Sequence, residues 1–186
     1  MDVVRTSIPG CVELRPAIHV DARGRFAKPF QASTFNALGL EAEWTELFFS
    51  VSGRGVIRGL HYQAPPSAHA KLVCCVAGEV FDVVVDLRAG SPAFGRFETF
   101  ELSGDAMQAV FVPTGCAHGF AARTEGAVVA YAVSSEHDPG RDTGLRWDRV
   151  PRLRWPFEAP VVSDRDAALP RFGELDTPFV YEAAHA

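Results

Sequence analysis

The amino-acid sequence predicts an all-β protein, folded as an antiparallel sandwich or barrel. β-branched and aromatic residues gather in short segments with polar residues at alternate positions, which is the pattern of half-buried strands. These segments recur about every ten residues and are separated by turns rich in glycine and proline, a spacing typical of antiparallel sandwiches and barrels. Helical periodicity is weak and is confined to residues 33–38 and 165–169.

The central part of the chain contains a series of predicted strands. The predicted strands cover residues 56–63, 71–77, 79–88, 96–102, 109–112, 118–122 and 127–134. Turn signals at 89–92, 103–104, 113–115 and 124–126 separate the later strands. The end of the chain is rich in proline, and we expect it to wrap around the strands as a C-terminal segment.

The strand at 79–88 indicates what the interior contains. Phe81, Val83 and Val85 share one face of this strand, while Asp82 and Val84 share the other. Because valines occupy both faces, we expect the strand to be buried on both sides, with Asp82 inside. A buried carboxylate needs a partner, so the sequence predicts a polar interior.

Size and composition restrict the class of protein. The chain has 186 residues, which suits one domain over 1–186, and its 47% apolar and 22% charged residues exclude disorder. A net charge of −5 argues against nucleic-acid binding, where a basic face dominates affinity. Its apolar stretches are far shorter than the roughly 20 residues of a membrane helix, and the N-terminus lacks a signal-peptide pattern. We expect a cytoplasmic protein that binds neither nucleic acid nor membrane.

The four cysteines indicate neither a zinc nor a redox motif. Cys11, Cys74, Cys75 and Cys116 form no Cys-x-x-Cys pair. Adjacent residues of a strand point to opposite faces, so Cys74 and Cys75 are not expected to bridge each other. We expect four buried, reduced thiols.

One group of candidate functional residues surrounds the segment Arg58-Gly59-Leu60-His61. Strict alternation places His61 on one face with Gln63 and places Arg58 on the other face. Lys71 opens an apolar run, where an ammonium is costly unless it faces a cavity or an anion. Each residue also has a structural interpretation, because a single histidine is often structural and Lys71 can be the solvated first residue of its strand.

A second group is Pro113-Thr114-Gly115-Cys116-Ala117-His118. It resembles the second half of the cupin signature, in which the proline and glycine form a turn and the histidine points into the barrel. This resemblance implies a cupin-like antiparallel jelly-roll barrel. Metal cupins add a His-x-His pair and a glutamate, whereas this chain has His69-Ala70-Lys71. The spacing of His61, His69 and His118 does not suit a three-histidine site, and we expect no metal.

Several further motifs resemble the dTDP-4-dehydrorhamnose 3,5-epimerase family. They occur in the family's order over roughly residues 8–173, and their regions are 21–26, 55–63, 78–92, 118–120, 144–148 and 163–166. The pair formed by Arg58-Gly59-Leu60-His61 and the Phe-Asp-x-x-x-Asp-x-Arg segment at 81–88 is the most specific. The resemblance implies a jelly-roll homodimer that inverts C3, C5 or both in a nucleotide-linked 4-keto-6-deoxyhexose, without metal or cofactor.

The resemblance also implies catalytic roles. Inversion beside a ketone needs a base, a group that stabilises the enolate oxygen, and an acid on the opposite face. His61 aligns with the base, and histidine side chains titrate near neutrality. Asp166 aligns with the carboxylate that orients this histidine, Lys71 with the enolate-stabilising group, and Tyr131 with the acid. Without the resemblance, Tyr131 reads as an ordinary core residue.

Other positions are implied in substrate binding. They are Arg23, Phe26, Lys28, Glu46, Phe48, Arg58, Gln63, His118 and His137. Arg23 and Arg58 align with diphosphate-binding arginines, whose guanidinium suits bidentate contacts. His118 is expected to pair with Asp82 in the interior. The sequence departs from the family at Glu46 and Phe48, which replace Gln and Asn, at Lys28, which replaces Glu, and at His137, which replaces Tyr.

Four functions are compared on this basis. The leading one is a cofactor-independent epimerase of a dTDP-linked 4-keto-6-deoxyhexose in deoxysugar biosynthesis. The alternatives are a C3-only epimerase or ketoisomerase of an unusual deoxysugar pathway, a non-catalytic sugar-nucleotide-binding cupin, and a metal cupin dioxygenase. Retention of His61, Lys71, Tyr131 and Asp166 favours catalysis, since a binding module does not need all four.

Overall fold

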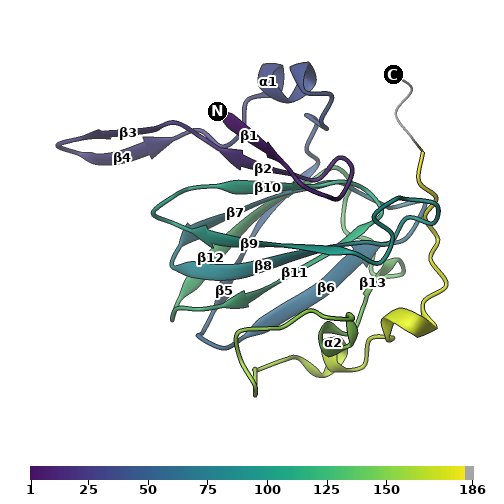
Figure 1. Ribbon diagram of the computed structural model, residues 1–186. Coiled ribbons are helices and arrows are strands. Elements are labelled where there is room, and N and C mark those ends of the chain that lie inside the picture. Colours follow the sequence, from purple (N-terminus) through teal and green to yellow (C-terminus); the bar gives the residue numbers. More distant parts are fainter. Residues whose placement is uncertain (183–186) are drawn as a thin grey trace.

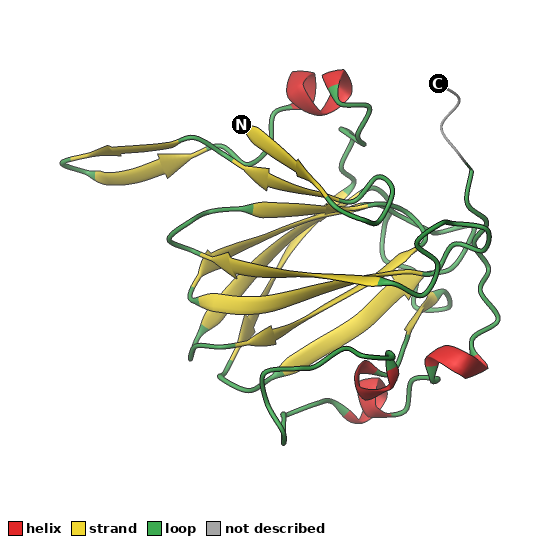
Figure 2. Cartoon of the chain, in the orientation of Figure 1, coloured by secondary structure: helices red, strands yellow, loops and turns green. Residues whose placement is uncertain are grey.

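Two antiparallel sheets face each other in the computed structural model, which describes residues 1–182 (Figures 1 and 2). The six-stranded sheet has the order β1-β2-β10-β7-β12-β5, and the five-stranded sheet has the order β13-β6-β11-β8-β9. The strands are β1 (Asp2–Arg5), β2 (Val12–Arg15), β3 (Ile18–Asp21), β4 (Gly24–Ala27), β5 (Glu46–Ser52), β6 (Ile57–Gln63), β7 (Lys71–Ala77), β8 (Glu79–Asp86), β9 (Phe97–Ser103), β10 (Ala109–Val112), β11 (Cys116–Ala122), β12 (Ala127–Val133) and β13 (Asp142–Gly144). This architecture confirms the predicted all-β class.

The helices are short, as the weak periodicity predicts. They are α1 (Ala32–Ala37), α2 (Asp164–Ala167) and the 3₁₀ turns η1 (Trp147–Arg149) and η2 (Phe172–Glu174). α1 and α2 begin one residue before the segments predicted from the sequence, whereas the two 3₁₀ turns are too short to give a periodic signal. The described residues include no helix long and apolar enough to span a membrane.

Strand β8 is buried on both faces, which confirms the interpretation of its valines. Val80 and Val84 belong to the core between the two sheets. Val83 and Val85 pack in a second core on the outer side of the five-stranded sheet. The C-terminal segment covers this outer side with Leu145, Val150, Leu153 and Phe179, so the expected wrap is present. Asp82 is fully buried.

The four cysteines are free and buried. Cys75 lies in the core between the sheets, whereas Cys74 lies in a third core outside the six-stranded sheet, next to Phe35 of α1. The two neighbours therefore point to opposite faces, as expected. Burial raises the pKa of the Cys11 thiol to about 12 and that of Cys75 to about 11, which favours the reduced, inert form.

A β-bulge between β6 and β11 overturns one prediction. His61 pairs with His118, and Arg58 pairs with Phe120. The two pairs are three residues apart on β6 but only two residues apart on β11, so β6 contains one extra residue. The extra residue restores Arg58 to the face that carries His61, and both line the same cavity. The prediction that Arg58 points away from His61 is therefore wrong, because alternation along a strand cannot register a bulge.

Two glycines allow the strands to approach at this bulge. Gly59 has φ of +124°, and a Cβ placed on it would lie 2.6 Å from the Cα of Gly119. A side chain at either position would push β6 and β11 apart, since backbone atoms cannot move aside locally. The close approach brings the backbone of β6, which carries His61, against β11, which carries His118.

The hairpin of β3 and β4 extends away from the barrel (Figure 1). Its strand residues are exposed except the half-buried Ala27, and Phe26 is 61% exposed. Arg23 at its tip forms an ion pair with Asp21, with 2.5 Å between the Nη2 and Oδ2 atoms. The hairpin therefore projects from the barrel and exposes the aromatic ring of Phe26.

Candidate active site

A cavity of about 620 Å³ opens between the two sheets. Its wall includes ten residues predicted from the sequence, which are Glu46, Phe48, Arg58, His61, Gln63, Lys71, His118, Tyr131, His137 and Asp166. β5, β7 and β12 supply one side of the wall, β6 and β11 supply the other, and α2 contributes from the C-terminal segment. The fold thus collects in one place residues that are far apart in the sequence.

His61 and Asp166 form a hydrogen-bonded dyad, although 105 residues separate them. His61 Nε2 lies 2.7 Å from Asp166 Oδ1, and the other carboxylate oxygen accepts a bond from the Gly59 N–H at 3.0 Å. Burial acts to raise the pKa of Asp166, but the hydrogen bonds from His61 and Gly59 together hold it below its ordinary value. An ionised Asp166 fixes the proton of His61 on Nε2 and leaves Nδ1 as the ring nitrogen that can accept a proton.

The position of Asp166 follows from local helix capping. Ser163 precedes α2, and its side-chain oxygen accepts a hydrogen bond from the Asp166 N–H at 3.1 Å. This cap satisfies a free donor of the first helical turn and fixes the direction of the short helix. The Asp166 side chain is then directed at β6, where it contacts both His61 and the backbone of Gly59.

Lys71 is a buried ammonium in the cavity wall. It is only 8% exposed, and its Nζ donates a hydrogen bond to the His61 carbonyl at 3.0 Å. Burial lowers the pKa of Lys71 to about 8, while the charges of Asp142 and Asp82 act in the opposite direction. At neutral pH this side chain carries a positive charge in a poorly solvated site, which suits the stabilisation of an oxyanion.

Tyr131 lies on β12, and the rings of Phe48 and His118 pack against its ring. Phe48 of the neighbouring strand β5 stacks on it with ring centroids 4.7 Å apart and an interplanar angle of 13°. His118 approaches it edge-on, with centroids 5.9 Å apart. Burial raises the pKa of Tyr131, so the phenol remains protonated throughout the neutral range.

His118 and Asp82 form the second buried pair. His118 Nε2 lies 2.7 Å from Asp82 Oδ2, and both side chains are almost completely buried. His118 also pairs with His61 across the β6–β11 ladder. The second carboxylate oxygen, Asp82 Oδ1, has no hydrogen-bond partner among residues 1–182. The polar interior expected from Asp82 is therefore present.

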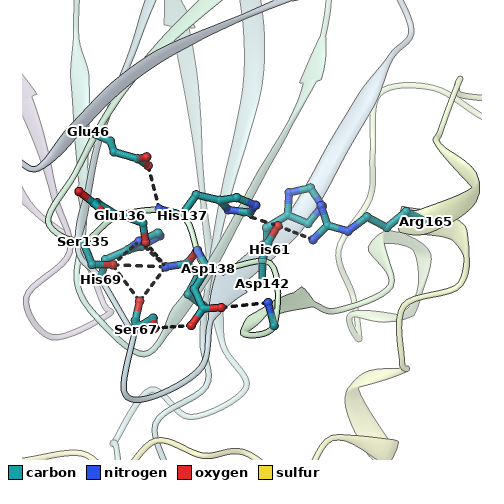
Figure 3. Close-up of polar contacts among 12 residues, drawn as sticks. Glu46, His61, Ser67, His69, Ser135, Glu136, His137, Asp138, Asp142 and Arg165 are labelled. Atoms are coloured by element: carbon teal, nitrogen blue, oxygen red, sulfur yellow. Dashed lines mark hydrogen bonds and ion pairs between the residues drawn. The ribbon is translucent and has the colours of Figure 1, made fainter.

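Charged residues at the cavity mouth connect α2 to β5 (Figure 3). Arg165 Nη2 binds Asp142 Oδ2 at 2.8 Å, and His137 Nδ1 lies 3.9 Å from the same oxygen. The backbone N–H of His137 donates to Glu46 Oε2 at 3.0 Å. Sequence reasoning did not identify Asp142. Arg165 was indicated only by its position next to Asp166, which aligns with a carboxylate of the family.

Gln63 anchors the loop that carries His137. Its Nε2 donates to the Ser67 carbonyl at 2.7 Å, and its Oε1 accepts from the Asp138 N–H at 2.7 Å. Ser67 in turn donates to Asp138 Oδ2. Both ends of the Gln63 amide are thus occupied by protein groups. His69 completes the cluster through Ser135, and its burial lowers its pKa to about 4, so its ring is neutral near neutral pH.

Arg58 is fixed beside the dyad by β5. Its Nε donates to the Ser52 hydroxyl at 3.0 Å, and one terminal nitrogen donates to the Val51 carbonyl at 3.1 Å. The guanidinium is therefore held in one orientation on the cavity wall while a further nitrogen remains available. A fixed guanidinium is well suited to bind a phosphate oxygen.

Three predicted binding residues lie elsewhere in the described part of the chain. Arg23, Phe26 and Lys28 belong to the projecting hairpin or follow it directly, outside the cavity wall. Residues 1–182 also contain no cluster of three or more histidine, cysteine or acidic side chains placed to bind a metal ion. The cavity thus brings together the predicted catalytic residues and part of the predicted binding set.

Comparison with known proteins identifies the family of this chain. Residues 5–174 match the family model of dTDP-4-dehydrorhamnose 3,5-epimerase. The chain is 37% identical to the dTDP-4-dehydrorhamnose 3,5-epimerase of Shigella flexneri over 178 residues, which cover 95% of this chain and 98% of that protein. It is also 38% identical to the dTDP-4-dehydrorhamnose 3-epimerase of Streptomyces niveus over 161 residues, covering 86% and 78% of the two chains.

A solved structure gives the same result for the fold. It is the dTDP-6-deoxy-D-glucose-3,5-epimerase of Legionella pneumophila in complex with dTDP-4-keto-L-rhamnose. The TM-score is 0.92 at 35% identity, and the match covers 98% of this chain and 99% of that one. This likeness confirms the cupin-like jelly roll. With a family model matched over most of its length, the chain belongs to the dTDP-4-dehydrorhamnose 3,5-epimerase family.

Proposed function

We propose that this protein is an epimerase that inverts C3, C5 or both in a dTDP-linked 4-keto-6-deoxyhexose, in deoxysugar biosynthesis. The observation that carries the proposal is the His61–Asp166 dyad, which lines the same cavity as Lys71 and Tyr131. These side chains supply the base, the oxyanion partner and the acid that the reaction needs. We further propose that residues 1–186 form one jelly-roll domain and act in the cytoplasm.

The proposed reaction has two proton transfers. His61 Nδ1 removes the proton from the carbon beside the ketone, and the electron pair of that C–H bond moves through the new C=C bond onto the ketone oxygen. Lys71 stabilises this enolate oxygen with its positive charge. Tyr131 then gives its hydroxyl proton to the opposite face of the carbon, which restores the ketone with inverted configuration. A proton from solvent restores Tyr131, and His61 loses its proton to solvent.

The experiment that tests this function follows the stereochemistry. The enzyme is incubated with dTDP-4-keto-6-deoxyglucose, the ketone is reduced with borohydride, and the released hexoses are identified. Hexoses inverted at C3, C5 or both support the proposal, whereas unchanged configuration at both carbons contradicts it. The relative named as a 3-epimerase favours C3 inversion alone as the second candidate, which the same products distinguish.

We also propose that two copies of the chain form a homodimer and that each hairpin completes the site of its partner. The projecting β3–β4 hairpin supports this, because it carries Arg23 and the exposed Phe26 away from the cavity of its own protomer. In this arrangement Arg23 contacts the diphosphate together with Arg58, and Phe26 packs on the nucleotide base. Lys28 and His137 then adjoin the same nucleotide.

Mixing two inactive variants tests the shared site. Arg23→Ala and His61→Ala are each expected to be inactive or nearly so, whereas unfolding and refolding them together is expected to restore part of the activity. The reason is that a mixed dimer contains one site in which neither residue is changed. Turnover after mixing is the measurement, and each variant refolded alone is the control. A mixture that stays at the level of the separate variants contradicts the crossing of Arg23.

The pH dependence tests the charge of Lys71. Since burial lowers the pKa of Lys71 to about 8, its protonated form is lost as the pH rises through this value. Turnover is therefore expected to fall with an alkaline limb near pH 8. Lys71→Arg keeps its charge at higher pH, so its residual activity is expected to lack this limb. A wild-type profile that stays flat far above pH 8 contradicts the role of Lys71.

Glu46 is expected to weaken nucleotide binding. An ionised carboxylate cannot donate a hydrogen bond, and it repels a nearby phosphate. Glu46→Gln is expected to tighten dTDP binding by roughly 3- to 10-fold in calorimetry, since it removes one charge from the cavity mouth. The amide oxygen can still accept from the His137 N–H, so the loop keeps its anchor. Glu46→Ala, which removes charge and anchor together, is the comparison variant. An unchanged dissociation constant in Glu46→Gln would refute the effect.

A further inference from the structure

In the proposed reaction a negative charge forms on Tyr131 and needs to be stabilised. The inference made from this rests on the proposed function. When its hydroxyl proton passes to the sugar, Tyr131 becomes a phenolate. The ring lies in the buried core of the jelly roll and is only 7% exposed, so water cannot solvate the new charge freely. Its neighbour across the ladder, Phe48, offers no hydrogen bond to the charged oxygen. Another group must therefore donate to it.

Strand β5 places a hydroxyl at the required position. Tyr131 pairs with Phe48, and Val129, two residues before Tyr131, pairs with Ser50. Ser50 is therefore the diagonal neighbour of Tyr131, and diagonal neighbours on one face of an antiparallel pair lie within reach of an aromatic side chain. Phe48 and Ser50 both line the cavity. The stacked ring of Phe48 fixes the Tyr131 ring from one side, and Ser50 follows on the same face.

The Ser50 hydroxyl is not used elsewhere. Its Oγ is buried and forms no hydrogen bond with any of residues 1–182 in this structure. It nevertheless lies close enough to Tyr131 to oppose the effect of burial, which raises the pKa of the phenol. A buried hydroxyl without a hydrogen-bond partner lowers the stability of the fold. Its position on the same face as Tyr131, the proposed acid, therefore suggests a function in the reaction.

Strand β5 also holds a positive charge from β6 on the wall of the cavity that Tyr131 lines. Ser52, the next residue on this face of β5, accepts a hydrogen bond from Arg58 Nε at 3.0 Å. The charge of Arg58 also lowers the pKa of Tyr131, although less than the Ser50 hydroxyl does. Ser52 thus fixes the guanidinium of Arg58 on the cavity wall that also contains Tyr131, while Ser50 is the candidate for the direct donor.

We infer that Ser50 is a positioning residue for the acid, and that its hydroxyl donates a hydrogen bond to the Tyr131 oxygen as that oxygen becomes a phenolate. The O–H bond of Tyr131 breaks, and a C–H bond forms with the electron pair of the enolate. The Ser50 O–H bond stays intact throughout and only rotates toward the negative oxygen. Ser50 thereby lowers the barrier of proton return without taking part in proton removal.

A pair of variants of equal shape tests this role. Ser50→Thr keeps a hydroxyl and Ser50→Val replaces it with a methyl group, while both suit a strand. Ser50→Val is expected to reduce kcat for inversion by roughly 10- to 100-fold, the range for a lost hydrogen bond to a charged group. KM and the entry of solvent deuterium at the reacting carbon are expected to stay near wild type. Ser50→Thr is expected to retain most of the inversion.

A double-mutant cycle shows whether Ser50 acts through Tyr131. In a Tyr131→Phe background, Ser50→Val is expected to cause no further loss, because the oxygen that Ser50 serves is absent. Inversion by Ser50→Val at the rate of Ser50→Thr, an equal loss of deuterium entry, or the full loss repeated in the Tyr131→Phe background would each overturn the inference. If Ser50→Val unfolds at lower temperature than Ser50→Thr, Ser50→Ala replaces it.

The wild-type enzyme in the same assay separates this inference from the proposed function. A wild type that inverts the sugar while Ser50→Val equals Ser50→Thr removes the role of Ser50 and leaves the epimerase function in place. A wild type that neither exchanges deuterium nor inverts the sugar removes both.

Discussion

Replacement of His61 with alanine is expected to abolish both solvent deuterium entry and inversion at the reacting carbon. His61 Nδ1 is the base in the account, and a general base typically contributes about 10²–10⁴-fold. Lys71 cannot take over, since it carries a positive charge at neutral pH and is buried against the His61 carbonyl. The measurement is NMR of the sugar ring protons in deuterated water, with turnover followed in parallel.

The neighbouring carboxylate gives a companion variant. Asp166→Asn is expected to lower both solvent deuterium entry and inversion strongly, because an amide no longer fixes the imidazole proton of His61 on Nε2. Thermal unfolding of both variants is the control, since Asp166 also accepts from the Gly59 backbone and its loss can loosen α2. Deuterium entry near the wild-type rate in a folded His61→Ala protein would remove His61 from the mechanism.

Tyr131→Phe is expected to separate proton removal from proton return. Only the hydroxyl is lost and the ring remains stacked on Phe48, so the free energy of unfolding is expected to fall by at most about 1 kcal/mol. The enolate still forms and is held by Lys71, but it can regain a proton only from the side of His61. Deuterium is therefore expected to enter the reacting carbon while inversion falls by about 10²–10⁴-fold.

Tyr181→Phe is the matched control for a lost phenol. Tyr181 lies in the C-terminal segment over the Arg88 guanidinium, outside the cavity wall, and its variant is expected to keep both readouts. Inversion by Tyr131→Phe at the wild-type rate would make Tyr131 an ordinary core residue. Loss of deuterium entry together with inversion would instead place Tyr131 on the abstraction step.

Local pattern in the sequence was sufficient for much of the fold. The valines of β8 alone indicate burial on both faces and an interior position for Asp82, because side-chain direction in a strand has a period of two. The same rule fails at Arg58, where the β6–β11 bulge adds a residue and turns the side chain into the cavity. A bulge depends on the partner strand, so one strand's own sequence does not reveal it.

The candidate site depended on long-range contacts that no local pattern reports. His61 and Asp166 are 105 residues apart, and their pairing followed from the family resemblance. Ser50 and Asp142 were not identified, because a lone serine in a strand or an aspartate in a loop carries no spacing signal. Their positions in the cavity wall follow only from the pairing of β5 with β12 and of β13 with β6.

The central claim is that each carbon that inverts loses its proton to His61 and regains one from solvent, through Tyr131, on the opposite face. The most direct measurement is incubation of the wild-type enzyme with dTDP-4-keto-6-deoxyglucose in deuterated water, with the C3 and C5 positions observed by NMR. The account predicts that deuterium appears at each carbon that inverts and at neither C1 nor C2. Inversion without deuterium at the inverted carbon, or the absence of any exchange at C3 and C5, would contradict it.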